Sequence, residues 1–330
     1  MAETTEIPGY VNVTDVRDTQ YDYQNAAYDN YIFMARAVYW SLMTLLVMTG
    51  IVGNSLVIYV IMTRQAMRNM FNLLLVNLAV ADLMLLITWS AFSIIFFLLT
   101  YSNLHLAKYI AYIDINGYIF RLSVYVSVYT LTLIAVVRYL VVAYPHKSKR
   151  FVARKPIGGI LAVIWIVSII FTPAIVSESS ITHPCYLSAV RFFLVFAYVL
   201  PLSLLATFSV LTFRRLKQPL GVTGSEGQKR NKKKAARLLV IIVVVFAVSW
   251  LPYHTNSIYW SVLFCNDQIF HIRFWFRVYN MSANVSALSN SVVNPIIYNL
   301  ASTTFRQHFR DALCCRRQRR SATNRPIALV

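Results

Sequence analysis

The chain has 330 residues, 58% of them hydrophobic, and its mean hydropathy is +0.57. Soluble domains are closer to half apolar, so this composition argues for a membrane protein. A formal net charge of +19 raises nucleic-acid binding as an alternative. Nucleic-acid binders interleave basic residues with exposed aromatic ones, whereas the aromatic residues here lie within apolar segments, so we expect no nucleic-acid partner.

The first part of the chain is polar. Residues 1–37 hold six of the twelve acidic residues together with several tyrosines, and they lack the basic start and early apolar run of a signal peptide. We expect a disordered tail, which could attract a basic ligand or act only as a solvated leader. Asn12 begins an Asn-Val-Thr triplet, which is a glycosylation acceptor if this tail is extracellular.

Seven apolar segments follow the tail, and each is long enough for a membrane helix, which needs about 20 residues. They lie at residues 38–62, 70–99, 109–142, 157–176, 192–213, 236–264 and 274–299. The sequence therefore predicts an all-α membrane protein, a seven-transmembrane helix bundle with a short amphipathic eighth helix. The expected units are an extracellular tail 1–35, a bundle 36–300, an amphipathic helix 301–315 and a cytoplasmic tail 316–330.

Basic residues are distributed unequally between the two sides of the predicted bundle. The connections on one side, together with the C-terminal region, hold 23 of the 31 Lys and Arg, and those on the opposite side hold six. Cytoplasmic connections carry the excess of Lys and Arg. The chain is therefore expected to be a multi-pass plasma-membrane protein with its N-terminus outside, its C-terminus in the cytoplasm and lipids as direct neighbours.

Charged side chains occur at membrane depth in the second and third segments. Asp82 has no charged neighbour in its own segment, and an unpaired carboxylate at this depth costs about 2.5 to 3.5 kcal/mol. It must therefore be protonated, hydrogen-bonded or paired with a cation, and the partners we expect for it are Asn54, Asn290 and Asn294. Arg138 lies near the cytoplasmic end of the third segment, where an arginine can simply extend to the headgroups, whereas Arg121 lies much further out.

The sixth and seventh segments each contain a proline. Pro252 follows Trp250 closely, and Pro295 follows Asn294 within a segment rich in Asn and Ser. Proline removes a backbone donor and kinks a helix, and amides at membrane depth must face protein or water. A kinked polar helix fits a bundle that moves or binds a ligand. Its polar groups could also serve only to join neighbouring helices.

The segment after the seventh crossing is amphipathic. Residues 302–313 place Phe and Leu on one face and Arg and Gln on another, which predicts a helix at the membrane surface. Cys314 and Cys315 follow it. Cysteines at such a position suit palmitoylation, and the alternative is two free thiols.

In order along the chain, these motifs resemble those of the rhodopsin-like family of G-protein-coupled receptors. The resemblance covers residues 36–315 and rests on one motif per crossing. The motifs are Gly53-Asn54, Leu78-Ala79-Val80-Ala81-Asp82-Leu83, Arg138-Tyr139, Trp165, Pro201, Phe246 with Trp250 and Pro252, and Asn294-Pro295-Ile296-Ile297-Tyr298.

The resemblance implies a role for each matching residue. It implies a receptor without enzymatic activity or a required cofactor, with heterotrimeric G proteins as partners and arrestin as a further candidate. A sodium ion is a candidate allosteric modulator, held by Asp82, Ser127, Asn290 and Asn294. The switch residues are Arg138, Tyr139, Phe246, Trp250, Pro252, Asn294, Pro295 and Tyr298.

Three positions depart from the family pattern. Val137 replaces the acid that usually precedes the arginine, which predicts raised basal signalling, and Ser209 replaces a tyrosine that usually partners Tyr298, which would weaken the active state. Ile113 replaces a cysteine that usually bonds to the second outer connection, so Cys185 lacks its usual partner. Whether Cys185 pairs with Cys265 stays open.

The candidate ligand-binding residues favour a peptide. Phe120 fills the place of the amine-binding aspartate and Leu288 that of the retinal-binding lysine, so amines and retinal are not expected. The chain resembles the galanin, allatostatin and somatostatin branch of neuropeptide receptors, and a lipid or organic acid seated on an arginine is the alternative ligand. The candidate residues are Phe120, Arg121, Tyr125, Tyr253, His254, Asn256, Tyr259 and Arg277.

Two other functional classes compete with a receptor. A transporter often shows inverted repeats, and the sequence contains no internal repeat. An enzyme would need a nucleophile or a metal-ligand pattern, and none lies at membrane depth.

Overall fold

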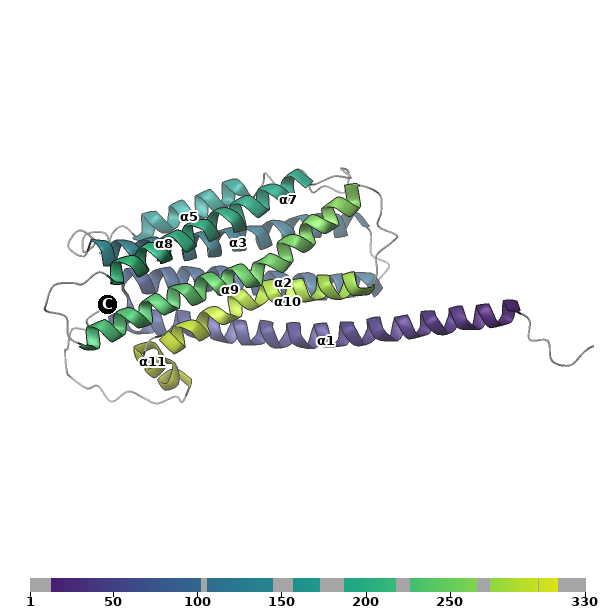
Figure 1. Cartoon of the computed structure of the whole chain (residues 1–330), viewed down its shortest axis with the longest axis horizontal. Helices are drawn as coiled ribbons and strands as arrows, with labels where there is room; N and C mark the ends of the chain where they lie inside the picture. The colour runs from purple at the N-terminus through teal and green to yellow at the C-terminus, as the bar shows by residue number, and fades with distance from the viewer. Residues whose placement is uncertain are drawn as a thin grey trace, which may run out of the picture.

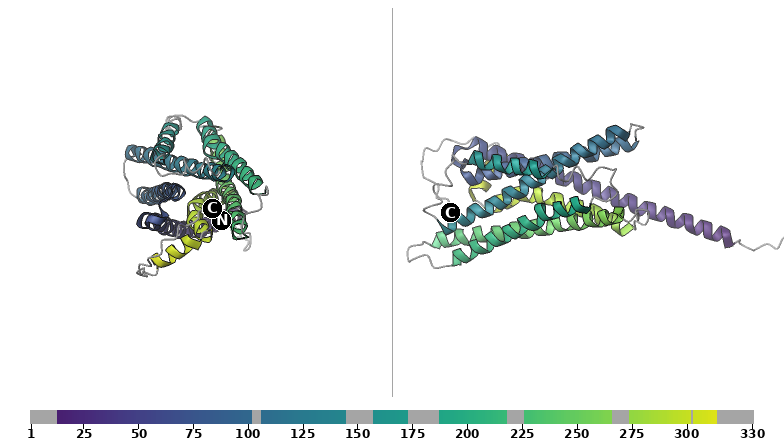
Figure 2. Two further views of the ribbon diagram at one scale, coloured as in Figure 1. Left: turned by 90° about the vertical axis from the view of Figure 1, so that its left-hand side faces the viewer. Right: turned by 90° about the horizontal axis from the view of Figure 1, so that it is seen from above.

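The computed structural model describes residues 13–101, 106–144, 157–172, 187–217, 226–265, 274–301 and 303–313. Within these residues the regular structure is entirely helical, as predicted. The long helices run roughly parallel to one axis, and α1 extends far beyond one end of the bundle (Figure 1). Seen end-on, they form one bundle (Figure 2). We call the end from which α1 protrudes the outer end, and the opposite end the inner end.

Helix α1 spans Val13–Thr63, so the expected disorder of the tail is wrong for residues 13–35. No glycine or proline occurs between Gly9 and Gly50, so nothing in the sequence interrupts the helix. Aspartates in its first turns also favour the helix, because the helix dipole is positive at its N-terminus. Hydropathy locates the apolar part of a helix and gives no information on where the helix begins in water.

Helices α2 (Met70–Tyr101), α3 (Leu106–Ala143) and α5 (Ile157–Phe171) pack beside one another. Asn77 of α2 joins all three, because its Nδ2 donates to Thr130 Oγ1 at 2.8 Å and its Oδ1 accepts from Trp165 Nε1 at 3.0 Å. A buried amide with both ends bonded carries little desolvation penalty and fixes the register of the three helices. This register places the outer half of α3 beside α2.

The fifth and sixth crossings are longer than predicted. The fifth consists of α7 (Leu187–Leu194), a π turn η2 (Val195–Val199) and α8 (Leu200–Lys217). The sixth, α9, spans Glu226–Cys265 and contains Pro252. The basic connection expected between the fifth and sixth apolar segments is therefore helical at both of its ends, because Lys, Arg, Gln and Ala are all good helix formers.

The seventh crossing, α10, spans Phe274–Ala301, and α11 spans Thr303–Leu313. Phe305 and Phe309 of α11 are buried against the bundle, whereas Arg306 and Arg310 are exposed, as the amphipathic pattern predicts. The Arg306 Nη2 donates to the Leu300 carbonyl at 3.1 Å and so caps the C-terminus of α10. Burial, together with the cation of Arg64, lowers the pKa of His308, which therefore packs as a neutral side chain near pH 7.

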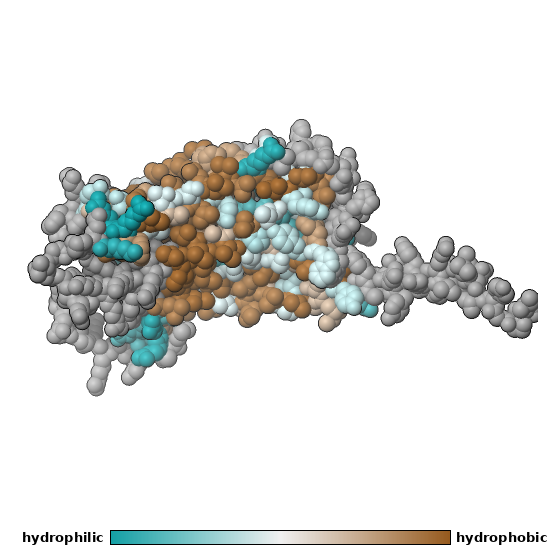
Figure 3. Space-filling model, in the orientation of Figure 1, coloured by the Kyte–Doolittle hydropathy of each residue, from teal (hydrophilic) through white to brown (hydrophobic). Residues whose placement is uncertain are grey.

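The described surface has the polarity of a membrane protein. Five helical stretches are long and apolar enough to cross a bilayer, namely Asn30–Thr63, Met70–Phe92, Ile115–Ala143, Ser188–Lys217 and Val240–Leu263. Helix α5 is apolar but described over only 15 residues, and α10 is long but rich in amides. On the face shown in Figure 3, hydrophobic residues cover much of the described surface, and the strongly hydrophilic ones lie mainly near the inner end.

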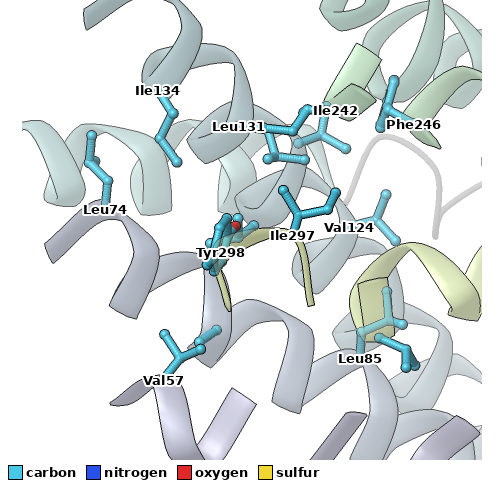
Figure 4. Close-up of a cluster of buried hydrophobic side chains, with 14 of the residues drawn as sticks. Val57, Leu74, Leu85, Val124, Leu131, Ile134, Ile242, Phe246, Ile297 and Tyr298 are labelled. Carbon is cyan, nitrogen blue, oxygen red and sulfur yellow. The ribbon is translucent and has the colours of Figure 1, made fainter. Parts of the chain in front are cut away.

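The hydrophobic core runs along the axis of the bundle. Around Tyr298 of α10, side chains from α1, α2, α3 and α9 meet in one apolar layer (Figure 4). The labelled residues include Val57, Leu74, Leu131, Ile134 and Ile242. This layer separates the polar groups at mid-depth from the inner end, so any signal between them must pass through packed side chains.

Candidate functional site

Asp82 lies at the centre of a buried hydrogen-bond cluster. Its side chain is fully buried, and its Oδ1 accepts from Ser127 Oγ at 3.2 Å and from Ser291 Oγ at 2.9 Å. Its Oδ2 accepts from Asn294 Nδ2 at 2.8 Å. These four residues, which we call the Asp82 cluster, join α2, α3 and α10 at a single point. Within the described chain, no basic side chain pairs with this carboxylate.

Close backbone packing between α1 and α10 supports the Asp82 cluster. A Cβ atom added at Gly53 would lie 3.1 Å from Pro295 Cγ, so the glycine lets the kinked part of α10 approach α1. Asn54 Nδ2 donates to the Ser291 carbonyl at 3.1 Å and to the Gly50 carbonyl at 2.9 Å. The amide thus satisfies a carbonyl one turn before Pro295, where the proline weakens the helix ladder.

The structure brings three of the four sodium-site candidates together. Asp82, Ser127 and Asn294 are in direct contact, whereas Asn290 Oδ1 lies 3.5 Å from Ser249 Oγ of α9 and has no bond to Asp82. Ser291 completes the cluster and was missed by the sequence interpretation. Its position three residues before Asn294, on the same helix face, was the available signal.

At the inner end, Arg138 lies near Tyr298, and no carboxylate among the described residues pairs with it. The two side chains interact electrostatically, and the Arg138 Nη1 and the Tyr298 hydroxyl are both buried without a hydrogen-bond partner. Val137 is buried in the apolar core, so the position that usually carries an acid contributes only packing. The Ser209 hydroxyl is likewise buried without a partner. Each of these three side chains therefore has a buried polar atom without a hydrogen-bond partner among the described residues.

The remaining switch candidates lie on the path between the two ends. Tyr139 packs on Phe208 with ring centroids 5.7 Å apart. Phe246 is fully buried and lies 5.8 Å from the Tyr198 ring. Pro252 and Pro295 both lie inside helices, at the predicted kink positions. These residues form links between neighbouring helices.

A group of aromatic rings gathers in the outer half of the bundle. Phe120 of α3 lies 5.6 Å from Trp89 and 5.9 Å from Tyr253, and Tyr253 lies 5.6 Å from Trp250 and 5.8 Å from His254. His254 is almost fully buried and its Nε2 has no hydrogen-bond partner. Aromatic surface with a few unpaired polar atoms is typical of a ligand site.

Tyr125 and Arg121 lie one turn apart on the same helix. Tyr125 is fully buried, its ring lies 5.6 Å from Phe193, and its hydroxyl has no partner. Phe193 in turn lies 5.4 Å from His254, which connects Tyr125 to the outer aromatic rings. Arg121 folds outward along α3, and a Cβ at Gly117 would lie 3.3 Å from its Nη2. The missing side chain at Gly117 therefore makes room for the guanidinium.

The other three ligand candidates lie on the outer parts of α9 and α10. Asn256 is buried and its Nδ2 donates to Asn280 Oδ1 at 2.8 Å, so one end of this amide is used in helix packing. Tyr259 is exposed and stacks on Phe276 at 4.0 Å. Arg277 is exposed, and among the described side chains it makes no hydrogen bond or ring contact with the aromatic group. Asn12, Cys185, Cys314 and Cys315 lie outside the described residues.

Known proteins resemble this chain over most of its length. The sequence profile described as "7 transmembrane receptor (rhodopsin family)" matches residues 53–298. The chain is 31% identical over 287 residues to the Allatostatin-A receptor of Bombyx mori, covering 81% of this chain and 76% of that receptor. It is 28% identical over 289 residues to Galanin receptor 2b of Danio rerio, covering 82% and 74%.

A third relative is the Tachykinin-like peptides receptor 86C of Drosophila melanogaster. It is 27% identical over 299 residues, which cover 82% of this chain. The matched part spans only 57% of that longer receptor.

Proposed function

The chain belongs to the rhodopsin family of seven-transmembrane receptors, and from that premise we propose that it binds an extracellular peptide and in response activates heterotrimeric G proteins. The family consists of multi-pass plasma-membrane receptors rather than enzymes. The observation that carries the proposal is the Asp82 cluster, where polar side chains of α2, α3 and α10 meet at mid-depth. A buried cluster shared by three helices can adopt alternative bonding arrangements, as a conformational switch requires.

A peptide is supported by the outer aromatic rings and by the relatives. Phe120, Tyr253 and His254 offer aromatic surface, and Tyr125 and His254 offer polar atoms without a partner. Such a surface matches a peptide end that carries both apolar side chains and amide groups. The names of the relatives quoted above refer to allatostatin A, galanin and tachykinin-like peptides.

In the proposed mechanism the ligand shifts a pre-existing equilibrium. Peptide contacts on Tyr253 and His254 bear on Trp250, which lies directly beneath them and next to Pro252. A change in the kink at Pro252 displaces the inner half of α9 and opens the inner end around Arg138 and its neighbours. The ligand acts by binding the open state more tightly than the closed one, and no covalent step is involved.

A sodium ion fits the Asp82 cluster as an allosteric modulator. A carboxylate and hydroxyl oxygens are the ligands preferred by hard cations, and the cluster contains both. Asp82, Ser127 and Asn294 would hold the ion, with Ser291 as an additional oxygen ligand. When bound, the ion would supply a positive charge to a carboxylate that has no basic partner among the described residues.

In the proposed membrane orientation, the N-terminus lies outside the cell and the C-terminus lies in the cytoplasm. The distribution of Lys and Arg supports this orientation. In this orientation Asn12 is a glycosylation site, Cys314 and Cys315 are palmitoylation sites, and the bundle extends over residues 36–300. An epitope tag at the N-terminus should be accessible on intact cells. A tag at the C-terminus should be accessible only after permeabilisation.

The test is a peptide screen with a matched inactive receptor. The full chain is expressed in cells, and allatostatin A, galanin, tachykinin, somatostatin and neuropeptide Y are applied while calcium and cyclic AMP are recorded. At least one peptide should give a saturable response that is lost in Arg138→Ala at equal surface expression. No response to any peptide, combined with ligand-free G-protein activation at the level of cells without receptor, contradicts the proposal.

A further inference from the structure

The π turn in the fifth crossing presents one tyrosine to the sixth. Residues Val195–Val199 form this turn, and single π turns inside α-helices are frequent at functional sites. On one side the turn is fixed to α3, because the Tyr129 hydroxyl donates to the Phe196 carbonyl at 3.3 Å. On the other side Tyr198 points toward α9, where its hydroxyl donates to the Ala247 carbonyl at 3.0 Å. The turn therefore connects α3 to α9 through two tyrosine hydroxyls.

Tyr198 contacts α9 on both sides of its proline. Its ring lies 5.8 Å from Phe246, which precedes Pro252, and 5.0 Å from His254, which follows it. Pro252 lacks the N–H that would bond the carbonyl four residues earlier, so the helix ladder of α9 is weakest between these two contacts. The carbonyl that accepts from Tyr198 belongs to Ala247, on the inner side of this weak point.

The outer half of α9 is bonded to α10. Asn256 donates to Asn280 at 2.8 Å, and the Tyr279 hydroxyl donates to the Pro252 carbonyl at 3.3 Å. The same Tyr279 hydroxyl also bonds Thr255. These bonds make the outer parts of α9 and α10 move together.

The inner half of α9 has weaker polar attachments. Among the described side chains, its bond to α10 is Ser249 Oγ to Asn290 Oδ1 at 3.5 Å, the limit of hydrogen-bond geometry. The shorter bond is the one from Tyr198 to Ala247. A displacement of the inner half of α9 away from the fifth crossing therefore breaks the Tyr198 bond.

We infer that Tyr198 is a positioning residue, whose hydroxyl holds the inner half of α9 against the bundle in the resting state. The inference rests on the proposed function, because it assigns to Tyr198 the resting equilibrium between the closed and open states of the receptor. Removing one neutral hydrogen bond shifts such an equilibrium by about fivefold. Tyr198→Phe should thus raise the ratio of open to closed receptor by about fivefold without any ligand.

The variant is chosen to leave the packing intact. Phenylalanine keeps the ring contacts with Phe246 and His254 and removes only the hydroxyl. Tyr129→Phe is the matched control, since it removes the half-buried α3 hydroxyl that bonds the same π turn but leaves the bond from Tyr198 to Ala247 in place. A loss of stability alone would affect both variants.

The first measurement is a distance distribution between the inner end of α3 and the inner half of α9. Spin labels are placed at Tyr144 and Val240, both of which are exposed, in a full chain whose four native cysteines are replaced. Electron–electron resonance in lipid nanodiscs without ligand then reports the closed and open populations. Tyr198→Phe should increase the ratio of longer-distance to shorter-distance populations about fivefold relative to its parent, and Tyr129→Phe should leave this ratio unchanged. An unchanged distribution in Tyr198→Phe, or an equal increase in both variants, overturns the inference.

The second measurement is ligand-free nucleotide exchange on purified G proteins of each class. A higher rate for Tyr198→Phe than for the parent supports the inference directly. A population shift without exchange on any G protein contradicts the proposed function and leaves the role of Tyr198 standing. If the parent catalyses exchange and Tyr198→Phe changes neither the exchange rate nor the distance distribution, the role of Tyr198 is contradicted. The proposed function then stands.

Discussion

Replacing Asp82 by alanine removes the acceptor of three buried hydrogen bonds. Ser127, Ser291 and Asn294 all donate to it, and each donor that stays buried and unpaired costs about 1 to 3 kcal/mol. The three donors together should therefore lower the free energy of unfolding by at least about 3 kcal/mol. In Asp82→Asn one carbonyl oxygen remains for the two hydroxyls, and Asn294 can turn its amide to accept from the new NH₂ group. This variant should keep most of the stability while losing the charge.

The assay is thermal unfolding of the purified full chain in nanodiscs, in sodium chloride and in choline chloride. Asp82→Ala should unfold at a clearly lower temperature than Asp82→Asn, and sodium should raise the midpoint of the parent but of neither variant. Asp311→Ala, which removes a carboxylate from α11, is the control and should keep the sodium response. Equal midpoints for the two Asp82 variants would refute the hydrogen-bond reasoning, and a sodium response in Asp82→Asn would refute the sodium site.

Three further predictions concern other parts of the bundle. Val137→Asp should give Arg138 a carboxylate partner and lower ligand-free G-protein activation at equal surface expression; unchanged or higher activation would contradict this role. Gly117→Val should displace the Arg121 guanidinium and weaken any peptide agonist that depends on it, measured as potency, with no further loss in an Arg121→Ala background. Phe309→Ala removes a buried ring, which typically costs about 3 to 5 kcal/mol, and should speed hydrogen exchange in α11 while the cores of α2 and α3 stay protected.

The sequence predicts the crossings well because hydropathy and helix length are local properties. All seven apolar segments coincide with described helices, and the face carrying Phe305 and Phe309 is buried as the amphipathic pattern indicates. The start of α1 at Val13 was not predicted, because residues 13–35 are polar and their helix depends on the absence of a breaker rather than on burial. The early start of α9 was not predicted either, because its first residues are polar and their helix rests on the helix propensity of Lys, Arg, Gln and Ala.

The candidate site could be predicted only where a buried polar group had to find a partner. Asp82 at membrane depth required hydrogen bonds, and Asn294 and Ser127 supply them. Ser291 and Tyr198 were missed because a serine in a polar helix and a tyrosine in an apolar one are unremarkable in a list of residues. Their importance depends on which carbonyl or carboxylate the neighbouring helix presents, and that is set by packing across the bundle.

The most direct test of the receptor assignment is nucleotide exchange by the purified full chain in lipid nanodiscs, measured on G proteins of each class with and without the peptide found by screening. The account predicts exchange above that of empty nanodiscs, further increased by the peptide and lost in Arg138→Ala. Exchange equal to empty nanodiscs for every G protein, with a correctly folded parent and a bound peptide, would contradict it.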